Sequence, residues 1–408
     1  MHTVTPEQLA TRLSALPARP RVVASGNFAT PLTALAVLDQ AVPEYTLFVL
    51  NAQTAMPDRD GVVLETCFVG PGMRGSPRLR YVPSRLSLTP VLFESALAPD
   101  VVLLHTTPPA GGTVSLGVEV DILPAAVEAV RRRGGLVVAQ ANRHMPYTPG
   151  DGVLDVEDID LLIEVDGPLP SPGPRVHDET AHAIGTSVAG LVSDGATLQT
   201  GIGAVPDAVL ASLVARRHLR MWTETFSDGV LALERAGAFD RDHPLHTSFV
   251  FGSPELYEWL DGNERVLMIR TQRINNPRRI AANRLMTSIN AALQVDLYDQ
   301  ANASRVRGRP YSGLGGQPDF VVGALHAPGG QAIIALPSWH ARAEVSTIVP
   351  LLDAPATSFQ HSSVVTDQGV ARMFGRSQRE QATELIENAA HPEAREGLRE
   401  YAVGAGLI

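Results

Sequence analysis

The sequence contains no lysine, and all 33 of its positively charged side chains are arginine. This absence excludes pyridoxal phosphate enzymes and Schiff-base aldolases, because both bond cofactor or substrate covalently to a lysine amine. It also excludes a Walker A loop, whose lysine contacts the bound phosphates.

Cysteine and aromatic side chains are also scarce. Cys67 is the single cysteine, and aromatic residues make up 5% of the chain. One cysteine excludes an intrachain disulfide and a C-x-x-C motif, and without a recognisable signal peptide it favours the cytoplasm. The sequence has no G-x-S-x-G or H-E-x-x-H motif, so we expect neither that type of serine hydrolase nor a bound metal.

Positive charge is in deficit, with 33 arginines against 43 acidic residues and a formal net charge of −10. Such a chain has no basic field for nucleic acid or an anionic membrane, so we expect neither of them as a partner. The longest uncharged run, 320–341, is interrupted by Pro328, Pro337 and glycines. We interpret it as two buried strands around a turn and predict no membrane segment.

The 408 residues are 44% hydrophobic and 19% charged, which is typical of a soluble globular chain with two domains. Short apolar runs alternate with helical patterns, as in open α/β domains with mostly parallel sheets. Expected strands cover 22–25, 46–50, 101–105 and 136–140, and expected helices cover 31–40 and 122–133. The proline-rich segment 167–175 predicts a division into domains 1–168 and 169–408, built as tandem versions of one architecture.

A glycine loop at 201–206 follows an expected strand at 197–200. Glycine lets the backbone approach a ligand, and Pro206 as the first residue of a helix leaves free N–H groups that point at it. The loop resembles a dinucleotide-binding turn, but its third glycine is missing and Asp207 would repel a pyrophosphate. A carbonyl that develops negative charge fits better, although a tight turn without a ligand stays an alternative.

Two acidic residues follow the next expected strand, near 219–223. Glu224 and Asp228 are four residues apart, so they can serve as an acid and a base. They can equally well be solvated carboxylates that cap the following helix.

The C-terminal half contains an alternating segment at 290–300 and a glycine loop at 311–320. Leu293, Val295 and Leu297 alternate with polar residues, which predicts a half-buried strand. The loop presents bare backbone, as packing against a flat ligand requires.

Long motifs in a fixed order support a family resemblance. They are PPAGGTVSLG at 108–117, VAQAN at 138–142, LQTGIGAVP at 198–206, TE at 223–224, FSDGV at 226–230, the loop 312–320, ALPS at 335–338, and VT and GVA at 365–371. Together they resemble the acetyl-CoA hydrolase/transferase family, which includes 4-hydroxybutyrate and succinate–acetate CoA-transferases. The resemblance implies two linked α/β domains of the CoA-transferase type with the active site between them.

The resemblance also implies ping-pong chemistry, in which a glutamate attacks an acyl-CoA and becomes a glutamyl-CoA thioester. The matching motif is 290–296, and the nucleophile position holds Gln294. A carboxamide is a poor nucleophile, because its nitrogen lone pair is delocalised into the carbonyl. We therefore expect hydrolysis of a short-chain acyl-CoA such as acetyl-CoA, with Gln294 orienting a water and Glu224 as general base. Transfer of CoA to a carboxylate, and binding of a CoA ester without turnover, are the alternatives.

Further site residues follow from these hypotheses. We expect Gly201, Ile202 and Gly203 to donate hydrogen bonds to the oxyanion. By resemblance, the CoA or acyl part lies on Gly313, Leu314, Gly315, Gly316 and Gln317. We expect no bound cofactor, since coenzyme A enters as the substrate thioester, and a homodimer is the expected assembly.

Overall fold

The structure is a computed structural model that describes residues 1–173, 178–354, 356 and 360–408. The chain divides into two compact units. Unit 1 consists of Met1–Pro172, Pro244–Ile274 and Tyr311–Gly315, and unit 2 of Gly173–His243, Asn275–Pro310 and Gly316–Ile408. The division at residue 168 stays a prediction, and residues 174 and 175 of the expected boundary segment lie outside the described residues. Both units are α/β, as predicted.

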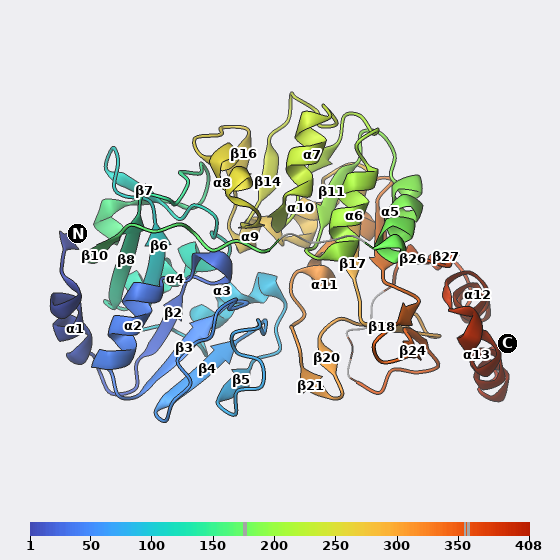
Figure 1. Cartoon of the computed structure of the whole chain (residues 1–408), viewed down its shortest axis with the longest axis horizontal. Helices are drawn as coiled ribbons and strands as arrows, with labels where there is room; N and C mark the ends of the chain where they lie inside the picture. The colour runs from blue at the N-terminus through green and yellow to red at the C-terminus, as the bar shows by residue number, and fades with distance from the viewer. Residues whose placement is uncertain (174–177, 355, 357–359) are drawn as a thin grey trace. The chain divides into compact units, whose positions relative to one another are not determined.

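Unit 1 is built on a sheet with the strand order β1-β10-β8-β6-β2-β3-β4-β5, whose neighbours run parallel (Figure 1). Most of its strands are apolar and buried, as expected of a sheet with helices on its faces. Their bounds are β1 His2–Thr3, β2 Arg21–Ala24, β3 Tyr45–Val49, β4 Val62–Thr66, β5 Leu79–Tyr81, β6 Val101–Thr106, β8 Leu136–Asn142 and β10 Leu161–Val165.

The helices of unit 1 begin where proline or a cap favours them. Thr5 forms a capping box with Gln8 at the start of α1, and α4 carries a proline in its first turn and Arg131 and Arg132 in its last. Helices α1 and α2 pack against each other, as do α3 and α4. Their bounds are α1 Pro6–Ser14, α2 Leu32–Ala41, α3 Thr89–Phe93, α4 Leu123–Arg132, α8 Pro254–Leu260 and α9 Thr271–Ile274.

Unit 2 is built on a second sheet, of order β12-β11-β17-β22-β26-β27. Its strands run parallel except for β27, which forms an antiparallel hairpin with β26. The bounds are β11 Thr197–Thr200, β12 Arg220–Met221, β17 Met286–Ala291, β22 Gln331–Ala335, β26 Ser363–Thr366 and β27 Gly369–Arg372. Its main helices are α5 Glu179–Leu191, α6 Ala204–Ser212, α7 Gly229–Arg235, α10 Pro277–Ala281, α11 Gln317–His326, α12 Gln378–Glu384 and α13 Pro392–Gly404.

In each sheet, the chain first adds a strand on one side of a given strand and later adds another on the opposite side, which defines a switch point. In unit 1 the chain proceeds from β2 to β3 on one side and later places β6 on the other. In unit 2 it proceeds from β11 to β12 and later places β17 on the opposite side. Open α/β sheets bind ligands at such switch points, outside the carboxyl ends of the strands. The loops after β2 and β11 are therefore the first places to look for a site.

The expected strands and helices of the N-terminal half are confirmed to within two residues at each end. The interpretation of the run 320–341 as two strands around a turn was wrong, because its first part belongs to helix α11, and the strands β22 and β23 (Trp339–His340) both follow this helix. A short buried apolar run does not distinguish helix from strand by its periodicity. In the described part of the chain, no helix is long and apolar enough to cross a membrane.

Candidate active site

The glycine loop of unit 2 lies at the switch point of its sheet. Strand β11 ends at Thr200, between β12 and β17, and Gly201, Ile202 and Gly203 follow directly. Gly203 has a φ of 128°, a conformation that favours glycine, and it is the residue before helix α6. No side chain caps α6. The first N–H groups of this helix and its dipole therefore face whatever occupies the loop.

Helix α6 begins two residues earlier than predicted. Its first residue is Ala204, so Pro206 is the third helical residue and not the first. Proline is tolerated anywhere in a first turn, because N–H groups there have no partner within the helix. Helix α6 therefore begins directly after Gly203 of the glycine loop.

Glu224 follows the strand next to this loop. The Thr223 hydroxyl donates to the Thr200 carbonyl oxygen at 3.1 Å and accepts from the Thr200 N–H at 3.3 Å. These two bonds tie the ends of β11 and β12 together, so Glu224 and Gly201 leave the sheet at adjacent points. Glu224 is half-buried, with part of its side chain accessible. A carboxylate and a set of backbone N–H groups thus meet at one edge.

Asn275 fixes the Glu224 carboxylate. Its Nδ2 donates to Oε2 of Glu224 at 2.7 Å, and the asparagine side chain is fully buried. Within the described residues, Oδ1 of Asn275 is a buried oxygen without a hydrogen-bond partner. Such an oxygen is costly unless a bound group supplies a donor. Asn275 was missed from the sequence, because it precedes Asn276 and Pro277 and so resembles part of a helix cap. Asn276 is indeed the residue that caps α10.

Gly316 packs directly against this pair. A Cβ atom at this position would overlap Oε2 of Glu224 and Nδ2 of Asn275. Gly316 is the residue before helix α11, whose first residue is Gln317. The glycine therefore leaves room for the carboxylate, which gives it a more specific role than the flat surface predicted from the loop composition.

The residues of that loop before Gly316, which are Tyr311–Gly315, belong to unit 1, whereas Gln317 belongs to unit 2. Gly313 pairs with Phe68 through an isolated bridge, and the Gly315 carbonyl accepts from the Leu86 N–H at 2.9 Å. A Cβ at position 313 would overlap the Cys67 carbonyl oxygen. Close backbone packing thus accounts for glycine at position 313. The expected CoA contacts of Gly313, Leu314, Gly315, Gly316 and Gln317 stay predictions.

Gln294 lies on a small separate sheet of unit 2. It begins β18 (Gln294–Asp296), which pairs with β19 (Ala301–Asn302) and β25 (Ile348–Val349). The predicted alternation is partly wrong, because Asp296 is fully buried. Its carboxylate accepts from the N–H groups of Tyr298 and Gln300, both at 3.0 Å, and so closes a turn.

Two further polar features surround the switch point. Oε1 of Gln199 accepts from the Ser288 hydroxyl at 2.6 Å and from Nδ2 of Asn290 at 3.1 Å, and all three side chains are buried. This network joins β11 to β17 beneath the glycine loop.

Asp228 is exposed, and its side chain makes no capping hydrogen bond to helix α7. The prediction that Asp228 caps this helix was therefore wrong.

Comparison with known proteins gives the family. The acetyl-CoA hydrolase/transferase N-terminal domain matches residues 53–170, and the C-terminal domain of the same family matches residues 252–402. A relative, 4-hydroxybutyrate coenzyme A transferase of Clostridium kluyveri, is 40% identical over 335 residues, which are 79% of this chain and 77% of the relative. The chain belongs to the acetyl-CoA hydrolase/transferase family.

Two further matches concern the hydrolase activity in the family name and the fold. Acetyl-CoA hydrolase of Kluyveromyces lactis is 34% identical over 215 residues, 50% of this chain and 40% of the relative. The crystal structure of RipA from Yersinia pestis superimposes with a TM-score of 0.92 and 28% identity, over 100% of this chain and 98% of that one. The predicted family and fold class are thereby confirmed.

Proposed function

We propose that the chain is an acyl-CoA:carboxylate CoA-transferase in which Glu224 carries the transferred group. The observation that supports this proposal is the placement of Glu224. Glu224 directly follows Thr223, whose hydroxyl is bonded to Thr200 at the switch-point edge of unit 2, and Asn275 holds the Glu224 carboxylate by a 2.7 Å hydrogen bond. Gly316 leaves room directly beside it. A fixed, partly accessible carboxylate next to backbone donors is suited to attack a thioester carbonyl.

The proposed reaction has four balanced steps. The Glu224 carboxylate attacks the thioester carbonyl, and the C–S bond breaks to give a mixed anhydride and CoA thiolate. The thiolate then attacks the glutamyl carbonyl, which releases the first carboxylic acid as its anion and leaves a glutamyl-CoA thioester. An acceptor carboxylate reverses both steps and departs as the new acyl-CoA. The N–H groups of Gly201, Ile202 and Gly203 are the proposed donors to each tetrahedral oxyanion.

Hydrolysis is the second candidate, and Gln294 is the observation that favours it. If the position occupied by Gln294 is that of the nucleophile in relatives, a glutamyl thioester cannot form there. Water then replaces the carboxylate acceptor, Gln294 orients it and Glu224 removes its proton. Both candidates use a short acyl-CoA and no bound cofactor, and a homodimer remains the expected assembly.

The test is thiol release from acetyl-, propionyl-, butyryl- and succinyl-CoA, with and without acetate. We expect exchange that depends on acetate in the unsubstituted chain. Glu224→Gln should lose about 10³-fold or more in kcat/KM, as expected when a nucleophile is removed. Glu128→Gln, which changes an exposed carboxylate of unit 1, is the control and should retain activity.

Borohydride and mass spectrometry separate the two candidates. Glutamyl-CoA should accumulate on the unsubstituted chain and be reduced at Glu224. Thiol release without acetate dependence and without a reducible adduct would establish hydrolysis. Binding of CoA esters with no thiol release, in the unsubstituted chain and in Gln294→Glu, would refute both activities and leave a binding protein.

A further inference from the structure

A second carboxyl cluster lies buried in unit 1, apart from the groups used above. Glu119 and Asp121 lie just after the motif at 108–117, and their exposed fractions are 1% and 0%. The segment is held by main-chain bonds, because the N–H groups of Val120 and Asp121 both donate to the Ser248 carbonyl oxygen. Two carboxyl side chains two residues apart are thus fixed inside the protein.

Two asparagines form a chain of hydrogen bonds that ends at the Glu119 carboxyl. Nδ2 of Asn27 donates to its two oxygens at 2.8 and 2.6 Å. Asn51 donates in turn to Oδ1 of Asn27 at 2.8 Å. Oδ1 of Asp121 accepts from the Ile122 N–H, whereas its Oδ2 is buried and has no hydrogen-bond partner among the described residues. The charge of Asp121 acts on Glu119, so the two buried carboxyl groups are neighbours. A buried carboxylate oxygen without a donor beside a second carboxyl group is satisfied when one of the two groups carries a proton, because only a protonated carboxyl can donate.

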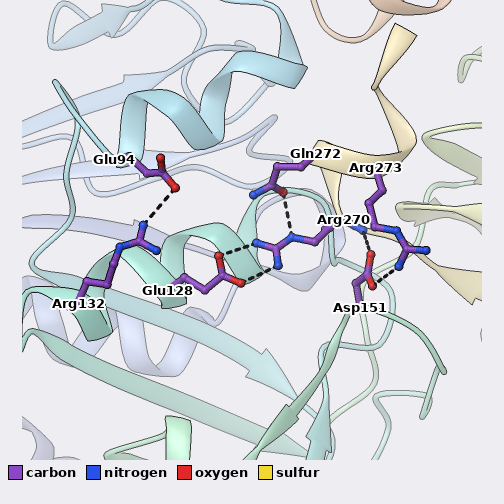
Figure 2. A network of polar contacts seen from close by, with 7 residues as sticks. All are labelled: Glu94, Glu128, Arg132, Asp151, Arg270, Gln272 and Arg273. Atoms are coloured by element: carbon purple, nitrogen blue, oxygen red, sulfur yellow. Dashed lines mark hydrogen bonds and ion pairs between the residues drawn. The ribbon is translucent and has the colours of Figure 1, made fainter. Parts of the chain in front are cut away.

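The charged groups on the neighbouring elements are engaged elsewhere. The N–H of Thr271 donates to the Asp121 carbonyl oxygen, and Arg270 is the residue before Thr271. Its guanidinium binds both oxygens of Glu128 at 2.6 and 2.9 Å, and Arg273 binds Asp151 at 2.6 Å (Figure 2). On helix α4, Arg132 pairs with Glu94 and Arg131 with Asp160.

Among the residues that the structure describes, no cation therefore compensates the buried pair. The segments that carry Asn27, Asn51 and Ser248 contribute neutral polar groups. In the described part of the chain, neither Glu119 nor Asp121 forms an ion pair with an arginine or histidine. Two buried carboxylates in contact cannot both ionise without a large free-energy cost.

We propose that Glu119 and Asp121 hold one proton between them at neutral pH, and that this proton locks Asn27 and Asn51 in place at the switch point of unit 1. Both asparagines have left-handed backbones, with φ of 47° and 51°, which cost energy outside glycine. They follow β2 and β3 at the carboxyl edge of the sheet. Asn27 is hydrogen-bonded to Glu119 of the protonated pair, and Asn51 is hydrogen-bonded to Asn27, so the pair holds both left-handed residues in place.

The direction of titration agrees with this geometry. Burial, followed by the charge of Asp121, raises the pKa of Glu119 well above its usual range. Burial raises the pKa of Asp121 to about 6. A carboxyl whose pKa is raised by folding stabilises the protein fully below its ordinary pKa, and this contribution is lost as pH rises through the folded pKa. When the proton leaves, the Glu119 O–H bond breaks, the proton passes to solvent and two negative charges face each other.

The test compares unfolding of the unsubstituted chain with Glu119→Gln between about pH 5 and about pH 8. Glutamine keeps an acceptor for Asn27 and supplies an N–H to Asp121 without a titrating proton. We expect the unfolding equilibrium constant of the unsubstituted chain to rise, relative to the variant, by about tenfold per pH unit until the pair ionises. Glu128→Gln, whose carboxylate is already ionised in this range, should follow the unsubstituted chain.

Parallel curves for the unsubstituted chain and Glu119→Gln would overturn the proposal. If that variant does not fold, Asp121→Asn supplies the same donor from the other side and should remove the same pH dependence. The unsubstituted chain also provides a direct measurement, because infrared spectra at neutral pH should contain the C=O band of a protonated buried carboxyl. Absence of that band would also overturn the proposal. None of these measurements depends on the proposed CoA-transferase activity.

Discussion

The two units place a glutamate, an asparagine and a glycine together at their switch points, with different outcomes. In unit 2, Glu224 is half-buried and receives the 2.7 Å bond from Asn275. In unit 1, Glu119 is fully buried, receives both bonds from Asn27 and contacts a second carboxyl. Burial and the neighbouring charge, rather than the residue types, therefore decide whether such a glutamate is available for chemistry or held as a neutral structural group.

In this comparison of the two units, the largest expected effect is the loss of kcat/KM caused by Gly316→Ala in unit 2. The added methyl overlaps Glu224 and Asn275, so the carboxylate must move. A displacement of about 1 Å lowers kcat/KM by about 10²-fold. Gly190→Ala, on helix α5 where a Cβ meets nothing within 4 Å, is the matched control. Full activity of Gly316→Ala in thiol-release kinetics would remove Glu224 from the mechanism.

The corresponding change in unit 1 should affect stability. Asn27→Ala removes the bonds to Glu119 and strains a left-handed position, for a loss of about 3 kcal/mol in the free energy of unfolding. Asn27→Gly keeps the backbone conformation and should lose about 1 kcal/mol less. Urea titration gives both values. Equal losses in the two variants would show that the left-handed backbone contributes nothing.

His105 should make the stability of unit 1 fall as pH decreases, which is opposite to the effect of the buried carboxyl pair. Burial lowers the pKa of His105 to about 4, so its stabilising contribution is complete above its ordinary pKa and is lost as pH falls toward the folded pKa. At about pH 5 the unsubstituted chain should have lost about 2 kcal/mol through this group. His105→Gln should be less sensitive between about pH 6.5 and about pH 4. Identical acid sensitivity in urea titrations would contradict this account.

Cys67 gives the smallest effect and reports on unit 1 alone. It is buried, and burial raises the pKa of its thiol to about 11. Thiolate is the reactive form, so we expect slow alkylation at neutral pH and fast alkylation after unfolding. Since Cys67 is the single cysteine, its labelling rate in urea follows the opening of unit 1. Rapid labelling of the native chain would mean that this unit opens readily.

Sequence patterns predicted the parts of the fold that depend on short-range order. Apolar runs and turn residues located strands such as β11, whose expected bounds agree with those observed. The glycine loop and Glu224 could also be placed at one sheet edge, because adjacent parallel strands end at the same edge. These expectations needed no knowledge of distant contacts.

Asn275 and Glu119 could not be predicted in the same way. Asn275 is separated from Glu224 by about fifty residues, and its neighbours form an ordinary helix cap. Glu119 and Asp121 alternate with valine, which predicts an exposed polar face, whereas both are buried. The partner of a polar side chain depends on tertiary packing, which periodicity alone does not contain.

The discontinuous make-up of unit 1 has a consequence for how the chain folds. Its last segment, Tyr311–Gly315, is far from Met1–Pro172 in sequence, yet Gly313 pairs with Phe68 and Tyr311 accepts from the Arg74 side chain at 2.7 Å. Contacts of such large sequence separation form slowly, because long loops must close first. During synthesis, the N-terminal sheet must therefore wait for residues well inside the second half of the chain before its structure is complete. A nascent chain released after residue 172 should leave apolar edges uncovered, and chaperones would be expected to bind it at this stage.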